Sequence, residues 1–289
     1  MRVGRGSCNG TFGELVQGVL DERPFLITLP IPALRSKAIF IPDTTDSRII
    51  GSCSNKKAIE ACKKLCQWFD VKEGGRLRID SNIPVGKGMA SSSADIVAAM
   101  KAVAHSYSLP LTEEMISLVA SEIEPTDGVM YQGAVAYDYI HGQLIESFGS
   151  LPPFLLIGVD TGGIVDTLQF NRLAKPYDRQ DRNQFTEAYE LARAGIKQKN
   201  MAYICKAATM SAHINQKILP KPYFHEFERL SRACQGGLVI AHSGTVMGIL
   251  LHPDIGVCEA VSQITNQLSS MVHHSRIKMY CYKEYEIGF

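Results

Sequence analysis

A short loop rich in glycine and serine limits what this chain can fold into and bind. In chain order, its residues are Pro84, Val85, Gly86, Lys87, Gly88, Met89, Ala90, Ser91, Ser92, Ser93 and Ala94. The glycines let the backbone turn sharply and approach a ligand closely. The serines stand where a helical pattern begins, and the unpaired N–H groups of a first helical turn favour an anion. We therefore expect a phosphate-binding loop, with a serine-rich N-cap after an ordinary loop as the alternative.

Sequence patterns on both sides place this loop between a strand and a helix. Residues 76–80 alternate in period two, as a strand does, and residues 94–107 repeat apolar side chains at helical spacing. The loop thus joins the end of a strand to a helix rich in alanine. Further helices are expected over 56–69, 112–124, 185–197, 201–215 and 257–268 and after Pro222, and further strands over 2–40, 133–139, 154–159, 238–241, 247–251 and 278–282.

The length of the chain predicts two lobes. At 289 residues it is long for one simple core, since domains of ~150 residues are typical. The proline pair Pro152–Pro153 separates two apolar stretches and is the expected boundary. It divides the chain into an N-terminal domain, residues 1–150, and a C-terminal domain, residues 151–289, with room for a ligand cleft between them.

Charge and hydropathy exclude several classes of partner. The 30 basic and 29 acidic residues give a net charge of +1, so no global field draws the protein to nucleic acid or to an anionic membrane. The N-terminus lacks the apolar core of a signal peptide, and no apolar run approaches the ~20 residues of a membrane span. We therefore expect a soluble, cytoplasmic protein that binds anions only through a local arrangement.

Two carboxylates follow one of the expected helices. Glu124 and Asp127 lie three residues apart, and Pro125 breaks the helix between them. A solvated helix end is the ordinary alternative, but the helix dipole opposes negative charge at a C-terminus. Phosphoryl transfer needs such a pair, because one carboxylate holds Mg²⁺ while the other accepts the proton of the substrate hydroxyl or orients that hydroxyl.

The loop from Pro84 to Ala94 lacks the signatures of two common nucleotide-binding motifs. The chain contains no G-x-x-x-x-G-K-[ST] sequence, and the dinucleotide pattern would need a glycine where Ser91 stands. The loop instead resembles the P-x-x-x-G-[LM]-x-S-S-x-A motif of the GHMP kinases, with Met89 in place of the usual leucine.

That resemblance implies a two-lobed α+β fold with ATP in the cleft between the lobes. The loop would wrap the triphosphate, and either Ser91 or Ser92 would reach Mg²⁺ through its hydroxyl. Glu124 would then bind the metal, and Asp127 would be the catalytic group at the substrate hydroxyl. Lys87 is either a charge beside the phosphates or a solvated loop lysine.

Two further segments resemble the other motifs of this superfamily. Residues 10–18 resemble the first motif, in which Glu14 would bind a substrate ammonium and Gln17 would hydrogen-bond the substrate; a glycine-rich hairpin is the alternative. Residues 241–248 stand in place of the glycine-rich third motif but lack its consecutive glycines. The substrate contacts expected there are His242, Ser243, Gly244 and Thr245. His242 is expected to orient other groups, because Asp127 already fills the place of the proton acceptor.

Within this superfamily, the residues of these motifs resemble those of the L-threonine kinases of cobalamin biosynthesis, the PduX type. It rests on Gly-Glu-Leu-Val-Gln-Gly, Lys-Gly-Met-Ala-Ser-Ser, Glu-Pro-Thr-Asp and Ala-His-Ser-Gly. It implies transfer of the γ-phosphoryl group of ATP to the side-chain hydroxyl of L-threonine, a precursor step for the aminopropanol linker. Homoserine kinase or another small-molecule GHMP kinase is the close alternative, and a catalytically silent metabolite sensor is the alternative of another class.

Some features remain open at this level. The partner expected is a small amino acid, and the oligomeric state, with a homodimer as one option, does not follow from the sequence. Residues 160–167 form either a surface turn or a loop on the substrate side. Adenine contacts are sought in residues 49–57.

Overall fold

A long N-terminal hairpin is the centre of the fold. The computed structural model describes residues 1–72, 74–163, 165, 170, 175–253 and 256–282. Strand β1 (Gly4–Leu20) pairs antiparallel with β2 (Arg23–Asp43), from Gly4 opposite Phe40 to Leu20 opposite Arg23. The expected strands at the N-terminus are therefore confirmed, as two unusually long ones. Their pairing shifts register on both sides of Glu14, where the regular ladder is interrupted.

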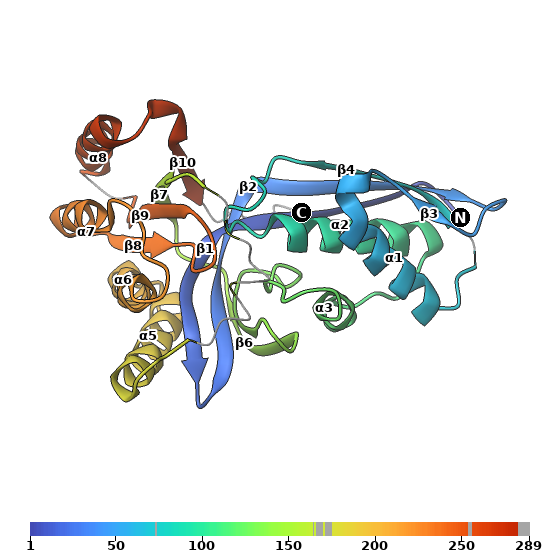
Figure 1. Cartoon of the computed structure of the whole chain (residues 1–289), viewed down its shortest axis with the longest axis horizontal. Helices are drawn as coiled ribbons and strands as arrows, with labels where there is room; N and C mark the ends of the chain where they lie inside the picture. The colour runs from blue at the N-terminus through green and yellow to red at the C-terminus, as the bar shows by residue number, and fades with distance from the viewer. Residues whose placement is uncertain (73, 164, 166–169, 171–174, 254–255, 283–289) are drawn as a thin grey trace.

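The hairpin belongs to one curled sheet that runs through the molecule (Figure 1). The other strands are β3 (Ile49–Ile50), β4 (Gly74–Ser81), β5 (Ala134–Asp138), β6 (Gln143–Gly149), β7 (Phe154–Asp160), β8 (Gly237–Ile240), β9 (Val246–Leu251) and β10 (Ile277–Tyr282). Within the described residues the order is β10-β7-β9-β8-β1-β2-β4-β3, with β5 on β2 and β6 on β5. Strand β8 meets β1 at the single pair Glu14 and Ile240, so Glu14 lies where the two halves of the sheet join.

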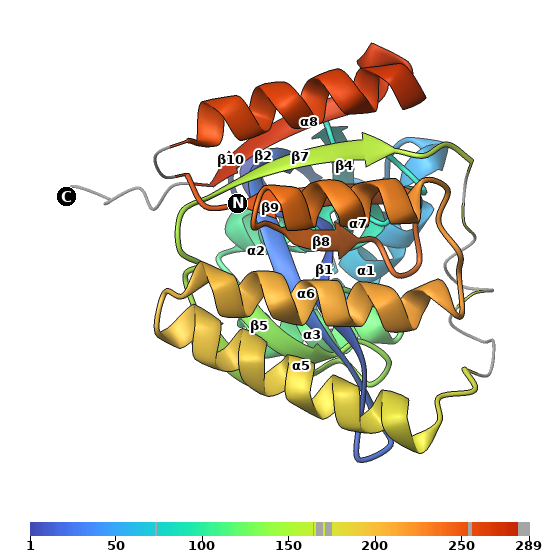
Figure 2. The same cartoon turned by 90° about the vertical axis from the view of Figure 1, so that its left-hand side faces the viewer.

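Helices cover both ends of this sheet. They are α1 (Lys56–Trp68), α2 (Ser91–Tyr107), α3 (Glu113–Ser121), α5 (Arg179–Lys197), α6 (Met201–Gln216), α7 (Phe224–Ala233) and α8 (Val257–Met271), with short 3₁₀ turns at Cys53–Asn55 and His274–Arg276. In Figure 1, α1 to α3 lie at one end with β2 and β4, and α5 to α8 lie at the other end with β7 to β9. Figure 2 shows the second group side by side from its outer face.

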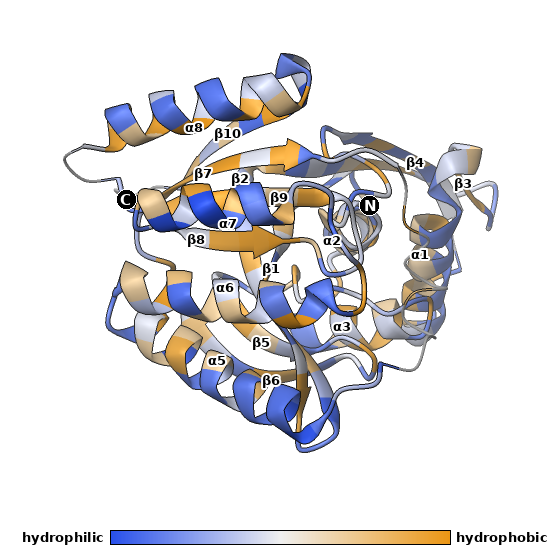
Figure 3. Ribbon diagram, turned by 60° about the vertical axis from the view of Figure 1, so that its left-hand side comes forward, coloured by the Kyte–Doolittle hydropathy of each residue, from blue (hydrophilic) through white to orange (hydrophobic). Residues whose placement is uncertain are grey.

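Helix α2 is the buried helix that carries the serines. Its side chains are mostly buried, and it packs against β1 and β2. The approach is close, because a Cβ on Gly6 of β1 would collide with the backbone of Ala98. Figure 3 shows the more usual arrangement at the other end, where apolar strands β8 and β9 lie beneath helices with polar outer faces.

Most of the predicted elements are confirmed, and the differences are at their ends. Helix α2 begins at Ser91, three residues earlier than predicted, and α3 ends at Ser121 rather than 124. Helix α5 begins at Arg179, six residues early, because the Asp178 side chain caps its first turn in a capping box with Asp181.

The mixture of helices with one largely antiparallel sheet confirms the α+β class. The predicted domain boundary at Pro152–Pro153 lies between β6 and β7, and the division at 150 and 151 stays a prediction. Within the residues described, no helix is long and apolar enough to cross a membrane.

Candidate active site

The glycine-rich loop takes a conformation that leaves the start of α2 open. Ala90 is the residue before the helix, with a left-handed backbone (φ 60°), and no side chain caps the first turn. The serine N-cap alternative is therefore wrong. The first bond of this helix runs from the N–H of Ala94 to the carbonyl of Ala90, so the N–H groups of Ser91 to Ser93 precede it. A helix start of this kind is suited to binding an anion.

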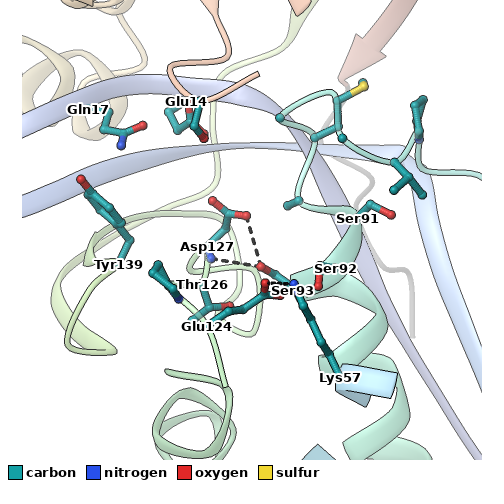
Figure 4. Close-up of a pocket in the computed structure, with 18 residues that line it drawn as sticks. Glu14, Gln17, Lys57, Ser91, Ser92, Ser93, Glu124, Thr126, Asp127 and Tyr139 are labelled. Carbon is teal, nitrogen blue, oxygen red and sulfur yellow. Dashed lines mark hydrogen bonds and ion pairs between the residues drawn. The ribbon is translucent and has the colours of Figure 1, made fainter. Parts of the chain in front are cut away.

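A cavity of about 240 Å³ opens in front of these N–H groups (Figure 4). It combines the loop with one residue from α1, two from β1 and the segment after α3. Its lining residues are Glu14, Gln17, Lys57, Pro84, Val85, Gly86, Gly88, Met89, Ala90, Ser91, Ser92, Ser93, Glu124, Pro125, Thr126, Asp127, Tyr139 and Ser243. The structure thus brings most of the predicted loop residues to one cavity with Glu124 and Asp127. Lys87 and Ala94 do not line it.

Glu124 and Ser92 face each other across the start of α2. The Ser92 hydroxyl donates to one carboxylate oxygen of Glu124, and the Lys57 ammonium pairs with the other. Glu124 is buried. The Ser91 hydroxyl points elsewhere, toward the carbonyl of Ile83 at 3.4 Å. The sequence did not decide between Ser91 and Ser92 as the metal-binding serine; in the structure, Ser92 is the one hydrogen-bonded to Glu124.

Asp127 is held by the next serine. The Ser93 hydroxyl donates to Asp127 Oδ2 at 3.2 Å and accepts the Asp127 N–H at 3.2 Å (Figure 4). Removal from bulk water raises the pKa of Asp127 to about 7, and the nearby carboxylates of Glu14 and Glu124 act in the same direction. A carboxyl with a pKa near neutrality can exchange a proton with a substrate hydroxyl.

Glu14 and Gln17 reach the cavity from β1. Glu14 Oε2 accepts the backbone N–H and the Nδ1–H of His242, each at 3.0 Å. Tyr139 lines the cavity beside Gln17, and its hydroxyl lies 3.4 Å from the ammonium of Lys175. Burial lowers the pKa of Lys175, and no carboxylate among the described residues pairs with it.

The third glycine-bearing segment packs onto the glycine-rich loop. A Cβ on Gly244 would collide with the Lys87 backbone, and the Thr245 N–H donates to the Lys87 carbonyl at 3.0 Å. Ser243 lines the cavity, whereas the Thr245 hydroxyl turns away to Asp160 Oδ1 at 2.7 Å.

Lys87 and Lys221 hold this contact from its two sides. Lys87 is not a solvated lysine, because its ammonium pairs with Asp160 Oδ2 at 2.7 Å and donates to the Gly163 carbonyl at 2.8 Å. Buried Lys221 donates to the Gly244 carbonyl, and burial lowers its pKa to about 8. Asp160 therefore has a defined partner, while residues 164, 166 and 167 of the expected polar loop lie outside the described residues.

Comparisons with known proteins agree with this arrangement. Residues 56–138, which contain the glycine-rich loop, Glu124 and Asp127, match the GHMP kinases N terminal domain. This part of the chain is therefore a GHMP kinase N-terminal domain.

Two curated relatives match this chain over most of its length. It is 28% identical to the L-threonine kinase of Salmonella typhimurium over 254 residues, which cover 86% of this chain and 83% of the relative. It is 25% identical to the L-threonine kinase of Citrobacter freundii, with 92% of both chains covered. Its fold is that of homoserine kinase from Cytophaga hutchinsonii, with a TM-score of 0.71 at 13% identity, covering 98% of this chain and 94% of that one.

Several residues in and around the cavity carry no sequence motif. Lys57 and Tyr139 line it, Lys175 lies next to Tyr139, and Lys221 is bonded to the Gly244 carbonyl. Thr126 did offer a signal, since it lies inside Glu-Pro-Thr-Asp; its hydroxyl oxygen is buried without a hydrogen-bond partner in the described part of the chain. A buried polar atom of this kind at a cavity wall is suited to a ligand contact.

Proposed function

We propose that this chain transfers the γ-phosphoryl group of ATP to the side-chain hydroxyl of L-threonine. The observation that carries the proposal is Asp127, which stands in one cavity between an anion-binding helix start and Glu14. The names of the two curated relatives support L-threonine as the acceptor. The motif resemblance extends the proposal to the supply of the aminopropanol linker in cobalamin biosynthesis, in the cytoplasm.

The donor set fits ATP with Mg²⁺. Mg²⁺ prefers hard oxygen ligands and is commonly held by one or two protein groups together with phosphates. Ser92 and Glu124 supply such oxygens beside the N–H groups of α2, and these two residues would hold the ion. When bound, Mg²⁺ neutralises charge on the transferring phosphoryl group. No cluster of three His, Cys, Asp or Glu that could hold a metal by itself occurs among the described residues, and this arrangement needs none.

Asp127 acts as the general base in this proposal. The threonine oxygen attacks the γ-phosphorus, its proton passes to Asp127, and the bond from phosphorus to the bridging oxygen breaks to release ADP. Ser93 fixes the orientation of the carboxylate, and the raised pKa of Asp127 suits a group that gains and then loses a proton near neutral pH. Positioning of the two substrates supplies much of the remaining acceleration.

The charged groups around the inner part of the cavity match an amino acid. Glu14 would accept hydrogen bonds from the substrate ammonium, and Gln17 would contact the substrate as well. The ammonium of Lys175, 3.4 Å from the hydroxyl of the cavity-lining Tyr139, would be the cation for the carboxylate. A substrate that carries an ammonium, a carboxylate and a hydroxyl would satisfy Glu14, Lys175 and Asp127 together.

A panel of hydroxylated amino acids with ATP and Mg²⁺ tests the proposal. L-Threonine, L-homoserine, L-serine and L-allothreonine are compared by ADP release, and the phosphorylated product is identified by ³¹P NMR. We expect the highest kcat/KM with L-threonine. Homoserine turnover well above that of threonine would favour the homoserine kinase alternative, and no turnover of any alcohol would favour a silent sensor.

A further inference from the structure

A buried chain of polar groups stands behind Glu14. His242 lies between β8 and β9, with its Nδ1 3.0 Å from Glu14 Oε2 and its Nε2 2.7 Å from the hydroxyl of Ser211 on α6. His242 and Glu14 are about 3% and 5% exposed, and Ser211 is fully buried. Three elements far apart in the sequence thus meet at one imidazole. Burying polar groups costs free energy unless each of them is hydrogen-bonded, so a row of three such groups at this position suggests a functional role.

The hydrogen bonds fix the orientation of the imidazole at both nitrogens. An ionised carboxylate only accepts, so the hydrogen that points at Glu14 belongs to Nδ1. The Ser211 oxygen accepts the N–H of Gln17 at 3.0 Å. The same oxygen is hydrogen-bonded to His242 Nε2 at 2.7 Å, and the hydroxyl lies within 3.4 Å of the Gln17 carbonyl. These hydrogen bonds form an unbroken series from the backbone of Gln17 on β1, through Ser211 and His242, to the carboxylate of Glu14.

Serine, histidine and an acid in this order also resemble the triad of a hydrolase. Ser211 cannot take that part here, because its oxygen is fully buried and is already engaged by Gln17 and His242. Ser243, not Ser211, lines the active-site cavity. The series of hydrogen bonds ends instead at Glu14, which lines that cavity. Ser211 and His242 therefore act on the position of Glu14.

Both bonds from His242 fall on the same oxygen of Glu14. Oε2 accepts the backbone N–H and the Nδ1–H of His242, whereas Oε1 accepts no hydrogen bond from a described residue. The charged groups that face Glu14 are Asp127 across the cavity and Lys221 behind it, whose ammonium is bonded to the Gly244 carbonyl. One oxygen of Glu14 is thus anchored, and the other is left for a ligand.

We propose that His242 is a positioning residue that, with Ser211, anchors Glu14 so that its second oxygen selects an alcohol that carries an amine. This inference rests on the proposed function and assigns the selection to a histidine that does not touch the substrate. Bonds to an ionised acceptor are among the stronger protein hydrogen bonds. Loss of the Nδ1 bond therefore frees Glu14 to turn, and recognition of the amine weakens while the ATP side is left intact.

The test compares L-threonine with the matching enantiomer of 3-hydroxybutyrate, which keeps the hydroxyl and carboxylate but lacks the amine. His242→Leu removes the ring donor, and His242→Asn keeps a side-chain N–H near the place of Nδ1. We expect His242→Leu to raise KM for threonine about tenfold or more, to leave KM for ATP within about twofold, and to leave kcat/KM for 3-hydroxybutyrate unchanged. His242→Asn recovers part of the loss.

Matched controls separate positioning from general damage. Ser211→Ala changes the packing less than His242→Leu does, and we expect it to raise KM for threonine as well. If His242→Leu does not fold, the Ser211→Ala variant is used for the test. Ser231→Ala removes another buried serine hydroxyl, on α7, and His213→Leu removes an exposed histidine from α6. Neither control should change the preference for the amine.

Two results would overturn the inference. One is an equal loss on threonine and 3-hydroxybutyrate in the His242 and Ser211 variants, which indicates damage without selection. The other is a natural-sequence protein that turns over the two compounds equally well. If that protein instead phosphorylates a different amine-bearing alcohol, the proposed substrate is wrong, and the same comparison with the amine-free analogue of that alcohol still tests His242.

Discussion

Replacing Asp127 with asparagine tests the centre of the proposed chemistry. The amide would keep the size of the side chain and a partner for Ser93, but it cannot take up the proton of the substrate hydroxyl. A positioned general base contributes about 10²- to 10⁴-fold, so kcat should fall by at least ~10². KM for ATP should stay within about twofold, because the phosphate contacts proposed for the loop and the metal contact proposed for Ser92 do not involve Asp127.

The pH dependence supplies a second measure of the same residue. With a pKa of about 7 in the free protein, Asp127 is mostly protonated at pH 6 and mostly ionised at pH 8. A base that must be ionised then gives a kcat/KM that rises about tenfold between these values, along a single titration curve. In Asp127→Asn this step should be absent.

Stability should change in the opposite direction to activity. The pKa of Asp127 is higher in the folded protein than in the unfolded chain, so the folded state favours the protonated form. Folding is therefore penalised as pH rises from about 4 through about 7, because the carboxyl must ionise beside Glu14 and Glu124 with no cationic partner in the described part of the chain. Asparagine removes that penalty, and the Tm of Asp127→Asn should exceed that of the natural sequence at pH 8 but not at pH 4.

The assay is steady-state ADP release across pH 5.5 to 9, with thermal melts of the same samples. Near-normal turnover of Asp127→Asn would refute the general-base role. A large loss of kcat that keeps the pH step would show that another group titrates. A Tm that falls at pH 8 would show that the Asp127 carboxylate stabilises the fold, contrary to its raised pKa.

The remaining predictions concern the loop and the substrate charges. Ser92→Ala should raise the Mg²⁺ concentration for half-maximal rate several-fold while Ser91→Ala changes it less, because Ser92, unlike Ser91, is hydrogen-bonded to Glu124; a Mg²⁺ titration checks this. Lys175→Met should raise KM for threonine about tenfold with little effect on KM for ATP, as measured with each substrate varied in turn. Gly88→Ala should weaken ATP binding in calorimetry, because φ there is 77° and a Cβ would meet Ala241.

The sequence was sufficient for the local elements because their signals are local. Helix α1, strand β4 and helix α6 fall close to where apolar spacing placed them. The glycine-rich loop stands between a strand and a helix as expected, and Glu124 and Asp127 reach the same cavity. Their individual roles, like those of the other predicted site residues, stay predictions. The early start of α5 also has a local signal in the sequence, the capping pair of Asp178 and Asp181.

Other features depend on contacts that no window of sequence contains. Lys57 and Glu124 are 67 residues apart, and Glu14 and His242 are 228 apart. The first pair meets where α1 packs against α3, and the second where β8 pairs with β1. The resemblance to the third motif located residues 241–248 near the site, but it could not predict which side chains face the cavity. Ser243 lines the cavity, whereas the Thr245 hydroxyl is bonded to Asp160.

The contact between the loop and the third segment links the two substrate sites physically. A Cβ on Gly88 would meet Ala241, and the Thr245 N–H is bonded to the Lys87 carbonyl. His242 follows Ala241 directly and anchors Glu14, so the backbone that holds the phosphate loop in place also carries the anchor of the proposed amine site. A shift of the loop on binding ATP would therefore move His242 as well. Affinity for threonine should depend on whether ATP is bound, and by linkage affinity for ATP should change by the same factor when threonine is bound; equal affinities in both orders of addition would show that the contact is passive.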